Sequence, residues 1–85
     1  MERAGEGDGV DQGIKANKTI GDNIRKARQT KGMTQEELSA KLQILECDIS
    51  RGTLAKIEAG IRHISLEEIN TIKRVLNMKY GDFFD

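Results

Sequence analysis

The sequence lacks proline entirely, and aromatic side chains make up only 4% of its 85 residues. No stretch approaches the roughly 18 consecutive apolar residues of a membrane-spanning helix, and the amino end has no apolar signal core. Runs of β-branched or aromatic residues are scarce, so an all-β fold has little support. These absences predict one small helical domain, and we expect a cytoplasmic protein that does not contact a membrane.

Cysteine and histidine are almost absent, because Cys47 and His63 are the sole examples of their types. One cysteine cannot form an internal disulfide, and one cysteine with one histidine cannot supply a four-ligand zinc site. No nucleophile–base pair involves either residue. We therefore expect no catalytic residue, no metal and no cofactor, and we predict that the protein is not an enzyme. Cys47 is expected to be a small, half-buried apolar residue.

The net charge is zero, which argues mildly against a nucleic-acid ligand, because many DNA-binding domains are basic. Residues 1–18 carry three basic and four acidic groups, four glycines and few apolar side chains. We predict a disordered tail over residues 1–18, since such a segment buries too little surface to offset its chain entropy. An ordered domain is predicted over residues 19–85, where any DNA binding must depend on a local basic face.

Apolar residues in the predicted domain recur at helical spacing. Ile20, Ile24 and Ala27 share one face and predict a helix over about 20–31. The next stripes predict helices over about 35–45, 51–59 and 66–76, followed by a short helical turn over 80–84. Their apolar positions are Leu38, Leu42, Leu45, Leu54, Ile57, Leu66, Ile69, Ile72 and Leu76. The fold class predicted from the sequence is therefore all-α, with four helices and a stub.

Local signals mark where these helices begin and end. Thr34 with Glu37, and Ser65 with Glu68, have the spacing of capping boxes, in which a hydroxyl and a carboxylate satisfy helix-terminal N–H groups. Ser50 is the expected cap of the helix over 51–59. The expected stops are Gly32, Gly60 and Asn77.

The second and third predicted helices have the properties of a helix-turn-helix. Ser39 supplies the small residue needed where the two helices cross, and Leu54 and Ile57 give the later helix a narrow apolar face. Most of that helix would then be free to enter a DNA major groove about 12 Å wide. Arg51 and Lys56 provide hydrogen-bonding capacity on its outer face.

Four segments in order resemble the Cro/CI-type (xenobiotic-response-element) helix-turn-helix family. They are Ile24-Arg25-Lys26-Ala27-Arg28, Thr34-Gln35-Glu36-Glu37-Leu38-Ser39, Thr53-Leu54-Ala55-Lys56-Ile57-Glu58-Ala59-Gly60 and Ser65-Leu66-Glu67-Glu68-Ile69. The resemblance covers about residues 20–84. It implies a compact four- to five-helix bundle, a lambda-repressor-like domain that is often dimeric. It also implies a transcriptional regulator, repressor-like in type, that binds operator DNA.

The same resemblance implies roles for individual residues. The positions that would read bases are Arg51, Gly52 and Lys56, with glycine standing where the family often has a reading side chain. The positions that would contact the DNA backbone are Thr34, Gln35, Thr53, Arg62 and His63. Arg28 and Glu58 match a pair that ties the first helix to the end of the third. Double-stranded DNA and a second copy of the chain are the expected partners, and no small-molecule ligand is evident.

The chain departs from the family pattern between the second and third helices. About five extra residues precede Ile49, which predicts a longer second helix and a bulged turn at residues 46–48. Ala59 and Ile61 also stand where polar phosphate contacts are common. These departures, the glycine at residue 52 and the neutral charge favour an alternative, in which the fold serves as a protein-interaction or antitoxin-like module with weak or no DNA binding.

Overall fold

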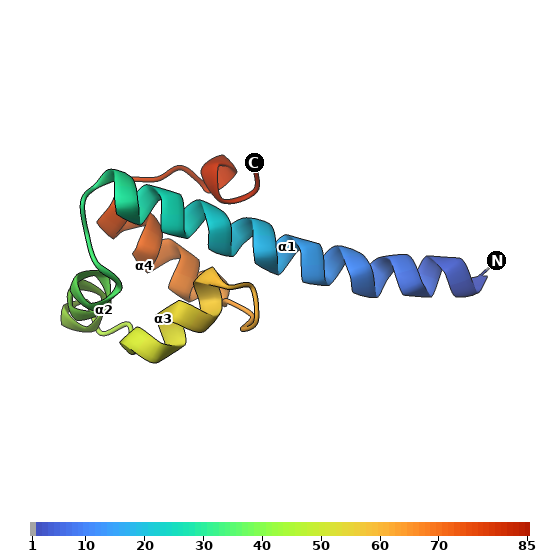
Figure 1. The fold of residues 1–85 in the computed structure, drawn as a ribbon, viewed down its shortest axis with the longest axis horizontal. Helices are drawn as coiled ribbons and strands as arrows, with labels where there is room; N and C mark the ends of the chain where they lie inside the picture. The colour runs from blue at the N-terminus through green and yellow to red at the C-terminus, as the bar shows by residue number, and fades with distance from the viewer. Residues whose placement is uncertain (1) are drawn as a thin grey trace.

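The computed structural model describes the backbone of residues 2–85 and the side chains from residue 16 onward. It contains four α-helices, α1 (Glu2–Thr30), α2 (Gln35–Ile44), α3 (Arg51–Glu58) and α4 (Leu66–Leu76), and a 3-10 turn, η1 (Tyr80–Phe83). The shorter helices and η1 gather around the carboxyl-terminal half of α1, and the amino-terminal half of α1 extends away from them (Figure 1). The predicted all-α, lambda-repressor-like class is confirmed.

The core lies where α1 meets the three shorter helices. Ile24, Leu38, Leu54, Ile72 and Phe83 are all fully buried, so every element contributes a side chain to one continuous core. The four residues from the α-helices fall on the apolar faces expected from helical spacing, and Phe83 closes the core from η1. Leu45 and Leu66 were expected on the same faces but are 40% and 66% exposed, so their predicted burial is wrong. This shared burial fixes the orientation of α3 against α1 and α2.

The helix caps form as their chemistry requires. The Thr34 hydroxyl accepts from the Glu37 N–H at 3.0 Å, while the Glu37 carboxylate accepts from the Thr34 N–H at 2.8 Å. The hydrogen bond that the Thr34 N–H donates to the carboxylate is the main cause that lowers the pKa of Glu37. Ser50 and Ser65 cap α3 and α4 through their hydroxyls. Gly32, Gly60 and Asn77 have positive φ at the predicted stops.

The amino end of α1 differs from the expected helix over about 20–31. The helix begins at Glu2, so the prediction that it starts near residue 20 is wrong. Adding a residue to an existing helix needs one local hydrogen bond and no tertiary burial, which is why apolar spacing did not reveal the extension. The side chains of residues 1–15 lie outside those described, so the tail over 1–18 and the boundary at residue 19 stay predictions.

The extra residues that precede Ile49 form a turn between α2 and α3. The helix α2 ends at Ile44, one residue before the predicted end, and Glu46 adopts a left-handed conformation with φ of 64°. The Cys47 N–H then donates to the Leu42 carbonyl at 2.9 Å, which closes the end of the helix. Residues 45–50 therefore form a folded turn, which we call the long turn.

Candidate nucleic-acid interface

The helix α3 has an apolar inner face and a cationic outer face. Leu54 and Ile57 are buried against the core, whereas Arg51 and Lys56 are exposed. Within the described residues, neither of these cations lies within ion-pair distance of a carboxylate. Both are therefore available to an anionic ligand.

The single acidic residue of α3 is removed from that face. Glu58 is 3% exposed and lies between α1 and α2, where it accepts hydrogen bonds from Arg28. The Arg28 Nε and one terminal guanidinium nitrogen donate to the two Glu58 carboxylate oxygens at 2.7 and 3.0 Å. The structure thus brings the predicted pair of Arg28 and Glu58 together in a bidentate arrangement.

Two further contacts complete this buried cluster. The other terminal nitrogen of Arg28 donates to the Met33 carbonyl at 2.8 Å, and the Gln35 amide nitrogen donates to Glu58 Oε1 at 3.0 Å. We call Arg28, Met33, Gln35 and Glu58 the anchor cluster. Because its members come from α1, the following loop, α2 and α3, the cluster fixes α3 relative to both neighbouring helices.

For Gln35, the sequence predicted the position in the chain but not the contact that its side chain makes. Its predicted position at the amino-terminus of α2 is correct, but its side-chain amide nitrogen donates to Glu58 inside the protein. Thr34 and Thr53 sit in the amino-terminal turns of α2 and α3. The Thr53 hydroxyl accepts from the Ser50 hydroxyl at 3.0 Å, so it belongs to the cap of α3 as well as to its surface.

Arg62, in the loop that follows α3, is held by other groups of the protein. Its two terminal nitrogens donate to the two Glu68 carboxylate oxygens, each at 3.0 Å, and one also donates to the His63 carbonyl. The Arg62 guanidinium holds the pKa of Glu68 below its usual range, and the Glu68 carboxylate raises that of Arg62. His63 is exposed on the same loop.

Hydrogen bonds that the sequence did not predict hold the long turn against α2. Ser39, predicted merely as a small residue at the helix crossing, is buried and donates its hydroxyl to the Ile49 carbonyl at 2.7 Å. The Gln43 amide nitrogen donates to the Ser39 hydroxyl at 3.1 Å. Ile49 immediately precedes the cap of α3, so these hydrogen bonds fix the point at which α3 begins.

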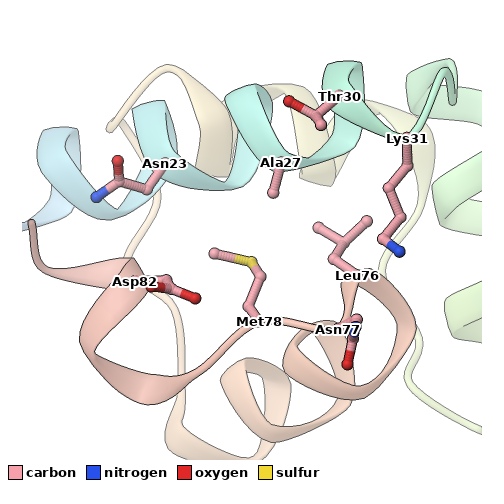
Figure 2. Close-up of a pocket in the computed structure, with 8 residues that line it drawn as sticks. All are labelled: Asn23, Ala27, Thr30, Lys31, Leu76, Asn77, Met78 and Asp82. Atoms are coloured by element: carbon pink, nitrogen blue, oxygen red, sulfur yellow. The ribbon is translucent and has the colours of Figure 1, made fainter.

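The described surface also contains two shallow hollows. One, of about 340 Å³, lies between α1, the end of α4 and η1, where Ala27, Leu76 and Met78 point toward one another (Figure 2). The other, of about 430 Å³, lies between the long turn and the start of α4 and includes Cys47. Burial raises the pKa of the Cys47 thiol. Neither hollow is lined by α3.

From residue 16 onward, no group of three or more histidine, cysteine or acidic side chains could hold a metal ion. The helices of the described chain include none that is long and apolar enough to cross a membrane.

Comparison with known proteins assigns the class of this domain. A sequence model described as helix-turn-helix matches residues 24–83, which include α2, α3 and α4 in full. The chain belongs to this family, of Cro/CI type, whose domains bind DNA. It is similar to the control protein C.BamHI of Bacillus amyloliquefaciens, with 35% identity over 67 residues, covering 78% of this chain and 76% of that protein. No solved structure matches the chain significantly.

Proposed function

We propose that this protein is a sequence-specific transcriptional regulator, repressor-like in type, that inserts α3 into the major groove of operator DNA. The observation that carries the proposal is the outer face of α3. Its exposed charges, Arg51 and Lys56, are both positive and unpaired among the described residues, while Glu58 is buried with Arg28. Similarity to a protein named as a control protein supports the regulatory role.

The roles of the individual residues follow from their positions. Arg51, at the first position of α3, would donate two hydrogen bonds to guanine, a contact that contributes about 1–3 kcal/mol of discrimination. Lys56 would contact bases about 1.4 helical turns further along α3. Gly52 is exposed on the same helix, between Arg51 and Lys56 in the sequence. Thr34, Thr53 and His63 would contact the phosphate backbone, which fixes orientation without reading sequence. Gln35 would do so through the main-chain N–H at the amino-terminus of α2, because its side-chain amide donates to Glu58.

Arg62 is the one predicted backbone contact that we now assign differently. Its guanidinium would have to leave both Glu68 oxygens before it could bind a phosphate. We therefore propose that Arg62 shapes the loop between α3 and α4 and contributes little to DNA affinity.

We further propose that the regulator works as a homodimer on an operator with two half-sites, about one helical turn apart. Aromatic exposure near the carboxyl end supports this assembly. Tyr80 and Phe84 are 49% and 57% exposed, respectively, next to the buried Phe83. Sedimentation equilibrium with and without the selected duplex would detect the dimer, and a monomer bound to a single half-site would contradict it.

The central experiment is selection of bound duplexes from a random-sequence DNA pool, followed by affinity measurement at several salt concentrations. We expect sequence-selective binding that weakens steeply with salt. Arg51→Ala should relax the base preference, whereas Arg74→Ala is a matched control because Arg74 is an exposed arginine on α4. Loss of selectivity in both variants, or in neither, would contradict the role of Arg51.

One observation favours an alternative function. Ile61 is 75% exposed in the loop that follows α3, where a DNA-binding domain gains more from a polar side chain. In a protein-interaction or antitoxin-like module, Ile61 would instead pack against a partner protein. The two functions are distinguished by the selection experiment, since the alternative predicts that no duplex is enriched.

A further inference from the structure

The glycines from residue 16 onward separate into those that the fold requires and those that it does not. A Cβ at Gly21 would lie 2.3 Å from the Ile57 carbonyl oxygen, and one at Gly60 would lie 2.8 Å from the Lys18 Cα. Gly32 and Gly60 have positive φ, which other residues rarely adopt. For each of these three positions, the fold itself explains why glycine is present.

Gly52 has no such explanation. It lies inside α3 with ordinary helical φ, and a Cβ built there would meet no heavy atom within 4 Å. Glycine is among the poorest helix formers, so α3 would be more stable with almost any other residue at this position. The folded chain therefore offers no internal benefit from glycine at residue 52.

The position of Gly52 points to a ligand, and not to the fold, as the reason for glycine at this residue. It is exposed and directly follows Arg51 in the first turn of α3, on the helix that carries the proposed base-reading residues. Glycine is also the residue that proteins use where the main chain must approach a ligand closely. Local rules of stability are commonly broken at functional sites.

We propose that Gly52 is a specificity-determining contact, where the α3 main chain approaches the base-pair edges of the major groove too closely to admit a Cβ. This inference rests on the proposed function, and it adds that α3 recognises the major groove at residue 52 by steric fit as well as by hydrogen bonds. A substituent at residue 52 would hold the amino-terminal turn of α3 away from the groove. Arg51, the adjacent residue, would then lose its two-bond geometry to guanine.

The test uses the full chain and the duplex that the wild type selects from a random pool. Gly52→Ala is expected to leave the urea midpoint equal or higher, because it removes a glycine from a helix, and to weaken binding by about tenfold or more, the scale of one lost base contact. Gly52→Leu, with a larger side chain, should weaken binding further. Gly81→Ala is the matched control, since Gly81 also has open space around it and lies in η1. Because Gly81 lies next to the proposed dimer surface, the variants are compared on a single half-site, where Gly81→Ala should bind as tightly as the wild type.

Three results would overturn the proposal. If Gly52→Ala binds the selected duplex as tightly as the wild type, the close approach does not exist, although DNA binding itself stands. If Gly52→Leu or Gly52→Gln binds more tightly, the position accommodates a side chain and is not a steric slot. If the wild type enriches no duplex, the proposed function fails and the contact fails with it.

Discussion

Replacing Gly21 with alanine should separate α1 from α3. Gly21 is buried in α1, and an alanine Cβ there would lie 2.3 and 2.6 Å from the carbonyl oxygens of Ile57 and Glu58 and 2.9 Å from the Glu58 carbonyl carbon. All three atoms belong to the main chain at the end of α3. No side-chain rotation can move them aside, so the two helices must shift apart.

The expected change in the unfolding free energy of Gly21→Ala follows from two opposing effects. Overpacking of a well-packed core costs about 1–3 kcal/mol, and rigid main-chain atoms place this site in the upper part of that range. Alanine returns about 0.5–1 kcal/mol because it is a better helix former than glycine. The net loss is about 1–2 kcal/mol of unfolding free energy, which lowers the melting temperature of a domain of this size by about 4–16 °C.

Urea titration and a thermal melt, both followed by circular dichroism, would measure this loss. Gly52→Ala is the matched control, because it makes the same chemical change in a helix where the added methyl meets no atom within 4 Å. It should leave stability unchanged or raise it by up to about 1 kcal/mol. A Gly21→Ala variant as stable as Gly52→Ala would refute the argument that close main-chain approach requires glycine at residue 21.

Three further predictions concern charged and nucleophilic groups. Glu58→Ala should lower the unfolding free energy measured by urea titration by about 3–5 kcal/mol, because it leaves the buried Arg28 guanidinium without its carboxylate. The double variant Arg28→Met with Glu58→Leu should recover much of this loss, and no recovery would argue against a charge effect. Because Arg62 lowers the pKa of Glu68 in the folded state, their pair should add stability above the ordinary value of 4.5 and lose it as pH falls through the lowered native pKa. The stability difference between wild type and Glu68→Gln should therefore shrink below pH 4.5, and a difference that grows there would contradict the assignment. Because burial raises the pKa of Cys47, iodoacetamide should alkylate it more slowly in the folded protein than in urea at neutral pH. Alkylation that mass spectrometry finds equally fast or faster in the folded protein would contradict this.

The parts of the fold that could be predicted from the sequence depend on short-range chemistry. A capping box places Thr34 and Glu37 three residues apart, so the bonds between them are set by local geometry and can be recognised in the chain itself. The apolar stripes are similarly local, and they correctly placed Ile24 and Leu54 in the core, but they did not distinguish these from the exposed Leu45 and Leu66. The pairing of Arg28 with Glu58 spans 30 residues, and the family resemblance was needed to predict it.

The parts that could not be predicted depend on how the helices meet. An arginine six residues from a glutamate has many possible partners, and the bidentate pairing of Arg62 with Glu68 exists only because the loop turns back onto α4. Ser39 was recognisable as small, but its bond to Ile49 depends on the path of the long turn. The DNA roles of Arg51, Gly52 and Lys56 stay predictions, because they concern contacts with a second molecule.

The anchor cluster determines the smallest fragment of this protein that could be grafted onto another scaffold. A fragment that begins at Thr34 and ends at Gly60 would contain α2, the long turn and α3, but it would carry Glu58 without the cation that Arg28 supplies from α1. The carboxylate would then draw water into the junction between the helices. A graft of the proposed DNA-recognition surface onto another scaffold must therefore include α1 at least through Arg28, or replace the whole charge cluster with apolar residues.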